Sequence, residues 1–230
     1  MDLNQSEKLL EKTFQSKFNI DNYEEFLVEL FNTPNMNRHD ETQFVKKAYF
    51  NYVDTVMNLG NYRDSNGESI GFYAIKLNKK GSRDRARTMQ RNLIAQLMTQ
   101  QHRNAALTAF IEPDSKDWRF SYVKLEYKLD EKGNIKKDLT SARRHSFLVG
   151  PNEPNHTCLK QFKELLAFEE KISLKQIEEA FNIENVTDEF FQEYKQLFSD
   201  LKDSLDKIIK NDNVVANEFQ TKKISTSDFA

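Results

Sequence analysis

The sequence predicts an α/β (α+β) protein with a small mixed sheet, a crossover helix, N-terminal helices and a C-terminal helical segment. Residues 70–77 and 105–111 are apolar runs of strand length, and residues 118–129 alternate along a third strand. Between the first two runs, apolar residues recur at helical spacing. The order strand, helix, strand is typical of a sheet with a crossover helix. Only six Gly and four Pro occur, which favours long helices over a turn-rich sandwich.

Residues 1–58 are expected to be N-terminal helices that pack on the core. Residues 4–18 and 22–32 have the apolar spacing of short amphipathic helices. A longer helix is expected over residues 41–58, ended by Leu59-Gly60, and the sequence D-S-N-G that follows predicts a turn.

Residues 59–154 are expected to form the α/β core. Ser82 is a plausible N-cap of the crossover helix, with Asp84 in its first turn. In the strand over 118–129, the alternation places two sets of side chains on opposite faces. One set begins Trp118, Phe120, Tyr122, Lys124, and the other begins Arg119, Ser121, Val123, Leu125. Residues 144–149 are expected to add a further strand.

Residues 155–212 are expected to be a helical segment, and residues 213–230 the start of a next region. Three helices are indicated, around 159–168, 174–181 and 188–210. The last carries an aromatic face, which either completes the core of this protein or docks a partner. This face consists of Phe190, Phe191, Tyr194 and Phe198.

Composition indicates a soluble, cytoplasmic protein with an aromatic core and no membrane span. The chain has 230 residues, 18 Phe, eight Tyr and one Trp, and no apolar run approaches the roughly 20 residues that cross a bilayer. The N-terminus lacks the basic-then-apolar order of a signal peptide. Cys158 is the single cysteine, so neither an internal disulfide nor a cysteine-based zinc site can form.

The segment R-D-R-A-R-T-M-Q-R is the first candidate site. Arg83, Arg87 and Arg91 recur every four residues, so on a helix they form one cationic ridge that suits phosphate groups. Arg143 and Arg144 are weaker candidates to extend this nucleic-acid-binding patch. The formal net charge is −2, so such contact must come from a local patch. The alternative is an ordinary solvated helix face.

A second candidate is a Mg²⁺ site with the order P-D … E-x-K of a large nuclease superfamily. Asp114 and Glu126 would be metal ligands, and Lys128 would assist the attacking water. All three would then be catalytic. Two further E-x-K triplets occur in predicted helices, at residues 169–171 and 193–195, so chance supplies the triplet readily. The alternative is that Glu126 and Lys128 form the solvated face of a strand.

Four segments together resemble the N-terminal region of bacterial type IIG restriction–modification enzymes. They are A-R-T-M-Q-R-N-L-I-A (86–95), A-A-L-T-A-F (105–110), D-W-R-F-S-Y-V-K-L-E-Y-K (117–128) and A-R-R-H-S-F-L-V-G-P-N-E-P-N-H-T (142–157). The terminal I-S-T-S-D-F-A (224–230) resembles the start of the next helical segment of such proteins. In that family one polypeptide combines an endonuclease, an adenine-specific DNA methyltransferase and a target-recognition region.

The resemblance implies a DNA-engaging region of a bacterial defence protein, with a Mg²⁺-dependent endonuclease site as its catalytic form. It also implies that the chain is a fragment. The methyltransferase, its S-adenosylmethionine site and the target-recognition region would then lie beyond Ala230, as partners. Two alternatives remain open at this point: a catalytically silent DNA-binding module, and an interaction module that docks the methyltransferase domain.

Overall fold

The computed structural model describes residues 2–32, 34–78, 86–129, 135–139, 145–168, 170–211 and 217. For residues 126–129, 135–139, 183–189 and 210–211 it describes the backbone alone. The chain divides into two compact units, residues 1–182 and residues 183–230. The first unit contains the sheet, the helices before it and the helices after it as far as residue 182. The last long helix belongs to the second unit.

The first unit is built on a seven-stranded mixed sheet, which confirms the predicted fold class. Its order is β1-β2-β3-β4-β5-β6, and β7 also pairs with β5. β3 and β4 are parallel, whereas the other described pairs are antiparallel. The crossover between them contains α4 (Arg87–Gln100). The strands are β1 (Asn35–Asp40), β2 (Val53–Arg63), β3 (Ser69–Leu77), β4 (Ala105–Ile111), β5 (Trp118–Leu129), β6 (Ile135–Leu139) and β7 (Ser146–Val149).

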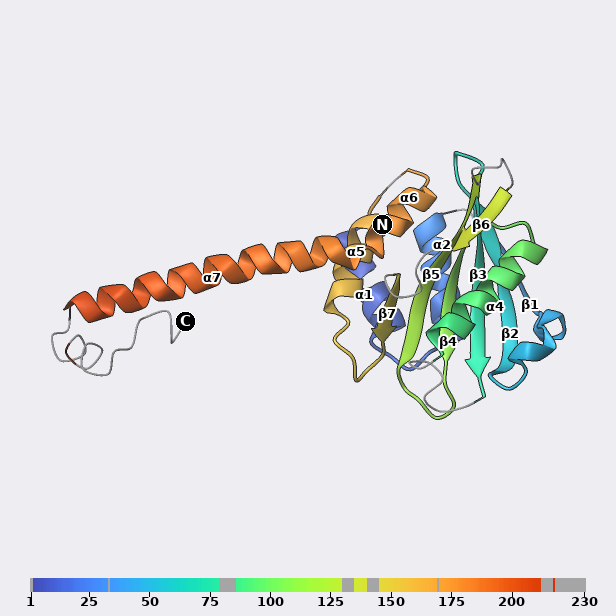
Figure 1. Ribbon diagram of the computed structural model, residues 1–230, viewed down its shortest axis with the longest axis horizontal. Helices are drawn as coiled ribbons and strands as arrows, with labels where there is room; N and C mark the ends of the chain where they lie inside the picture. Colours follow the sequence, from blue (N-terminus) through green and yellow to red (C-terminus); the bar gives the residue numbers. More distant parts are fainter. Residues whose placement is uncertain are drawn as a thin grey trace. The chain divides into compact units, whose positions relative to one another are not determined.

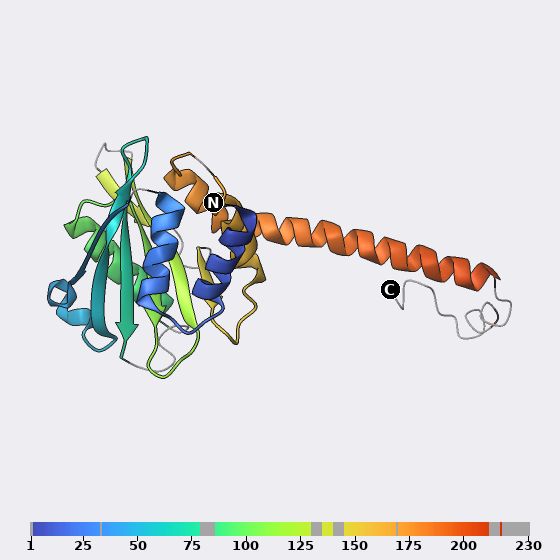
Figure 2. The same cartoon turned by 180° about the vertical axis from the view of Figure 1, so that it is seen from behind.

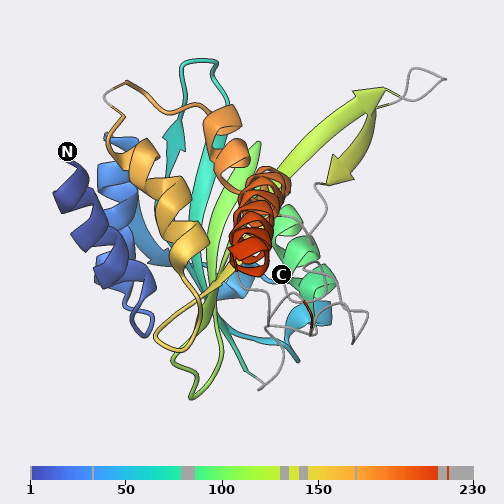
Figure 3. The ribbon, with the colours of Figure 1, turned by 90° about the vertical axis from the view of Figure 1, so that its left-hand side faces the viewer.

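Helices cover both faces of this sheet (Figures 1 and 3). Four helices pack on one face, and two of them, α1 and α2, stand in front of the sheet in Figure 2. The four are α1 (Leu3–Phe14), α2 (Ile20–Phe31), α5 (His156–Leu166) and α6 (Leu174–Ala180). α4 covers the opposite face. The first unit is therefore a three-layer arrangement with two separate cores.

The core under α1, α2 and α5 is aromatic, as the composition predicts. The rings of Phe14 and Phe26 lie 4.9 Å apart, edge to face, and Phe14 stacks on Trp118 at 5.5 Å. Trp118 and Phe120 of β5 are at most 1% exposed. Offset and edge-to-face pairs of this kind stabilise beyond the apolar area that they bury.

The core under α4 is aliphatic and confirms the predicted alternation of β5. Leu93, Ile94, Leu97 and Met98 of α4 are fully buried and belong to one cluster with Val123 and Leu125 of β5. Since Trp118, Phe120 and Tyr122 pack on the other face, the two sets of β5 side chains separate as expected.

The predicted helix over residues 41–58 is wrong. This segment holds two short 3₁₀ turns, Thr42–Phe44 and Lys47–Tyr49, and then β2. The register of β2 shifts between Val53 and Thr55 and again between Asn58 and Gly60. Each irregularity interrupts the two-residue period of a strand, so Val53 and Val56 are both buried in one cluster although they lie three residues apart. This spacing imitates that of a helix.

Other elements differ in detail from the expectation. α1, α2, β3, β4, β5, α5 and α6 form where the pattern predicts them. β1 and β6 have no counterpart in the prediction. α4 begins at Arg87 with Ala86 at its N-cap, not at Ser82. The residues Ser82 and Asp84 lie outside the described part of the chain.

The second unit contains α7 (Ile183–Asn211), an amphipathic helix of 29 residues. Phe190, Phe191 and Tyr194 are 66%, 60% and 54% exposed, so α7 does not bury them within its own unit, and the expectation that they complete the core of this protein stays a prediction. Within the described residues, no helix is both long enough and apolar enough to pass through a bilayer.

Candidate nucleic-acid interface

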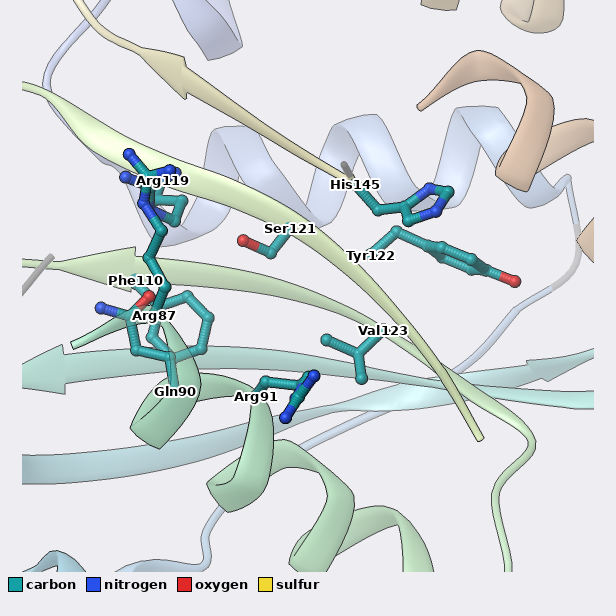
Figure 4. A pocket seen from close by; sticks show the side chains of 9 residues that line it. All are labelled: Arg87, Gln90, Arg91, Phe110, Arg119, Ser121, Tyr122, Val123 and His145. Atoms are coloured by element: carbon teal, nitrogen blue, oxygen red, sulfur yellow. The ribbon is translucent and has the colours of Figure 1, made fainter. Parts of the chain in front are cut away.

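A small pocket lies between the first turns of α4 and the face of β5 that α4 covers (Figure 4). Residues from four parts of the chain line it. They are Arg87, Gln90 and Arg91 of α4, Phe110 of β4, Arg119, Ser121, Tyr122 and Val123 of β5, and His145 just before β7. We call this the α4–β5 pocket.

α4 positions three of these residues because positions 87, 90 and 91 fall on one flank of a helix. Leu93 and Leu97, which are fully buried, anchor the helix on the sheet. Arg87 is exposed, Arg91 is half-buried and Gln90 is buried. Figure 4 shows the arginines projecting from α4 toward β5.

β5 supplies the third arginine of the pocket. Arg119 is only 5% exposed, and its Nη1 donates a hydrogen bond to Ser146 Oγ at 3.0 Å. Ser146 opens β7 and is paired in register with Ser121. The edge strand β7 therefore fixes the position of a guanidinium group that points toward α4.

Sequence reasoning did not select Arg119 for this role, although a signal was present. The alternation of β5 places Arg119 on the same face as Val123 and Leu125, which are buried. A charged side chain on the buried face of a strand requires compensating polar contacts, and such positions are often functional.

A backbone hydrogen bond to β5 positions His145 at the pocket. The backbone N–H of Tyr122 donates a hydrogen bond to the carbonyl oxygen of His145 at 2.9 Å, and the two rings lie 6.0 Å apart. Figure 4 shows both rings at one end of the pocket, away from Arg87 and Arg119.

The pocket is strongly cationic. Three guanidinium groups line it, and no described Asp or Glu does. Neither Arg87 nor Arg91 forms an ion pair within 4 Å with another described residue, and the buried Nε of Arg91 has no hydrogen-bond partner among those residues. Guanidinium donors without such partners are able to form charge-assisted hydrogen bonds with an anion.

The volume of the pocket limits what can enter it. About 20 Å³ is available, close to the 10–15 Å³ that one water molecule requires. A single oxygen atom of a phosphate or carboxylate fits, whereas a whole nucleotide does not.

The predicted arginine ridge is only partly described. Arg87 and Arg91 lie together on α4, on the flank that faces β5. Arg83, Arg143 and Arg144 lie outside the described residues, so their role stays a prediction. His145, the residue that follows Arg144, lines the pocket.

The structure does not bring the predicted metal ligands together. Asp114 is exposed in the turn between β4 and β5, with φ of 60°. Glu126 lies eight residues beyond Trp118, which begins β5, and eight residues of strand span about 26 Å. One cation reaches ligands only about 2.5 Å from its centre. The proposed pairing of Asp114 with Glu126 around one Mg²⁺ is therefore wrong.

Lys128, like Glu126, lies far along β5 from Asp114. Both residues lie where β5 extends past β4 and pairs with β6: Lys128 is opposite Lys136, and Glu126 is opposite Asp138. Only the backbone is described there. Among the described residues, no three His, Cys, Asp or Glu side chains lie close enough together to hold a metal ion.

No protein-family model, no curated protein and no solved structure matches this chain.

Proposed function

We propose that this chain binds the phosphate backbone of DNA at the α4–β5 pocket, as the N-terminal DNA-engaging region of a bacterial restriction–modification protein. One observation carries the proposal. Arg87 and Arg91 of α4, neither of which forms an ion pair with a described residue, line a single pocket together with Arg119 of β5, which is distant in sequence. Guanidinium groups bind phosphate through paired, charge-assisted hydrogen bonds.

The size and charge of the pocket support a phosphate of a polymer over a small-molecule ligand. A cavity of about 20 Å³ can receive one phosphate oxygen but cannot enclose a cofactor. Because the net charge of the chain is −2, the local cluster of arginines must provide the attraction.

The segments behind the family resemblance give separate support. Each of the four contributes at least one side chain to the pocket: Arg87 and Arg91 from residues 86–95, Phe110 from 105–110, Arg119 from 117–128, and His145 from 142–157. Segments that are far apart in the chain thus meet at the site for which DNA contact is proposed.

Between a Mg²⁺-dependent endonuclease and a catalytically silent DNA-binding module, the geometry favours the binding module. The endonuclease form depends on Asp114, Glu126 and Lys128, and these do not converge. Our proposal therefore assigns DNA binding to this chain and assigns no cleavage step to those three residues.

The proposal is tested by measuring the affinity of the chain for a short, labelled, blunt DNA duplex by fluorescence anisotropy at low salt. Arg87→Gln should weaken binding about tenfold, since one charge-assisted contact contributes roughly 1.5 kcal/mol. Arg87 is exposed, so this substitution should leave the fold intact.

Arg63→Gln is the matched control. Arg63 is exposed at the end of β2, and its Nη1 donates to the carbonyl of Gly67 at 3.1 Å. The Arg63→Gln substitution removes one positive charge at another place on the surface. It should change the affinity for the duplex less than twofold, which corresponds to roughly 0.4 kcal/mol of binding free energy, because an exposed charge contributes little. Equal weakening by both variants would show that only total charge matters and would overturn the assignment to the pocket.

A second candidate function is favoured by one observation on α7. Within the second unit taken by itself, six large apolar side chains of this helix are each at least 44% exposed, and an apolar face of this kind is typical of a surface that binds another protein or domain. They are Phe190, Phe191, Tyr194, Leu197, Leu201 and Ile208. In this reading α7 docks an adenine-specific methyltransferase domain. Leu197→Asp should abolish co-migration with such a domain in gel filtration while duplex binding persists; unchanged co-migration would remove α7 from this role.

A further inference from the structure

A groove of about 420 Å³ lies along another flank of α4, facing the segment that precedes β2. Asn92, Gln96 and Gln100 line it from the helix, and Lys46 and Tyr49 line it from the segment 42–52. α4 therefore borders two sites: the α4–β5 pocket through Arg87 and Arg91, and this groove through the residues that follow. No described Asp or Glu lines either site.

The segment 42–52 is held firmly against α4. Gln96 Nε2 donates to the carbonyl of Phe44 at 2.7 Å, and Gln96 Oε1 accepts from the N–H of Lys46 at 3.2 Å. At the end of the segment, Asn78 donates two hydrogen bonds. Its backbone N–H donates to the carbonyl of Tyr52 at 3.0 Å, and its side-chain Nδ2 donates to the carbonyl of Phe50 at 3.0 Å. Two 3₁₀ turns complete the backbone hydrogen bonding.

This segment exposes aromatic rings although its backbone is fixed. Phe44 and Phe50 are 53% and 54% exposed, and Tyr52 is 39% exposed. Between Thr42 and Tyr52 there are two lysines, Lys46 and Lys47, and no acidic residue, in a chain that has 36 Asp and Glu. Aromatic rings interleaved with lysines on a firm backbone are typical of surfaces on which bases of single-stranded nucleic acid stack.

The amides of the groove can contact the edge of a base. Gln96 is occupied by the segment itself. Asn92 is exposed and makes no hydrogen bond with another described residue, and Gln100 is exposed with only its Oε1 accepting, from Gln96 Nε2 at 3.3 Å. Carboxamide groups present a donor and an acceptor side by side, which is the pattern that base edges match.

We propose that this groove takes an unpaired nucleobase of a DNA strand, stacked on Tyr49, while a phosphate of the same strand occupies the α4–β5 pocket. The inference rests on the proposed function and extends it from backbone contact to unpaired DNA. Stacking requires an open base face, which a base inside a duplex does not offer. Arg91 and Ala95, one at each site, lie four residues apart, about 6 Å along the axis of α4. Because the two sites lie on different flanks of a helix that is about 10–12 Å wide with its side chains, the phosphate that reaches the pocket lies a few nucleotides from the stacked base.

The test compares a blunt duplex with the same duplex carrying a single-stranded tail, again by anisotropy. The chain should bind the tailed DNA about tenfold more tightly, the contribution of one stacked base. Tyr49→Leu, which removes the ring but keeps an apolar side chain at this half-buried position, should remove this preference and leave the affinity for blunt duplex unchanged.

Phe168→Leu is the matched control, because Phe168 is an accessible aromatic residue, 44% exposed, that follows α5 on the opposite face of the sheet. It should retain the preference for tailed DNA. Equal binding of the two DNAs by the unaltered chain, or weakening of both DNAs to the same extent by Tyr49→Leu, would overturn this inference. Loss of the Arg87 effect on blunt duplex would instead overturn the proposed function, so the two failures are distinguishable.

Discussion

At the scale of single residues, the three described arginines of the pocket differ in burial and therefore in role. Arg119 is buried and is fixed by Ser146, whereas Arg91 is half-buried and Arg87 is exposed. A fixed, desolvated guanidinium loses little conformational freedom when an anion arrives, whereas an exposed one must first be ordered. We therefore expect Arg119 to define the position of the phosphate and Arg87 to close over it.

Gly60 gives a prediction at this scale. Its φ of +137° is disfavoured for other residues, and an added Cβ would lie 2.2 Å from the carbonyl oxygen of Asn35 on β1. Gly60→Ala should therefore destabilise the protein by about 3 kcal/mol or more, from backbone strain and overlap together. Urea denaturation measures this.

Gly67→Ala is the comparison for that experiment. Gly67 also has a positive φ, of +81°, but an added Cβ would meet nothing within 4 Å. Its cost should be limited to backbone strain, about 1 kcal/mol. Equal losses for the two variants would contradict the close approach of β1 to β2 at Gly60.

At the scale of elements, the sequence predicts those whose period is undisturbed. β3 and β4 are continuous apolar runs of strand length, β5 alternates and α5 keeps a 3.6-residue spacing, and all four form as expected. β2 has no such regular pattern, because its register shift between Val53 and Thr55 places Val53 and Val56 on one side. β1 reads N-M-N-R-H-D and has only Met36 as an apolar residue. An edge strand needs no apolar face, so its sequence carries no strand signal.

The connection between the β2–β3 turn and α6 gives a prediction at this scale. Asp64 is 6% exposed, and its carboxylate accepts hydrogen bonds from the N–H groups of Asn66 and Glu68, both at 2.9 Å, and of Leu174 at 3.2 Å. Asp64→Ala leaves these donors without an acceptor and should cost about 2 kcal/mol or more in urea denaturation.

Asp54→Ala controls for the loss of a carboxylate. Asp54 is exposed on β2, so its replacement should change stability by about 0.5 kcal/mol or less. If Asp64→Ala were as mild as Asp54→Ala, the link between the β2–β3 turn and α6 would not contribute to the fold.

At the scale of the whole molecule, the candidate site depends on tertiary convergence that no local pattern contains. Periodicity places Arg87 and Arg91 on one helix flank and Arg119 on one strand face, but only the pairing of β4 with β5 and the packing of α4 bring them together. The same limit explains the incorrect metal site. Asp114 and Glu126 fit a linear motif, but β5 separates them along its length.

The net charge of −2 makes the central claim measurable, because the chain has no overall cationic field to attract DNA. The most direct measurement is the dependence of duplex affinity on salt concentration, for the unaltered chain and for the double variant Arg87→Gln/Arg91→Gln. If both side chains neutralise phosphates, the slope of log K against log salt should become shallower by about 1.8, that is, about 0.9 for each lost contact. An unchanged slope in a folded double variant would contradict phosphate binding at the α4–β5 pocket.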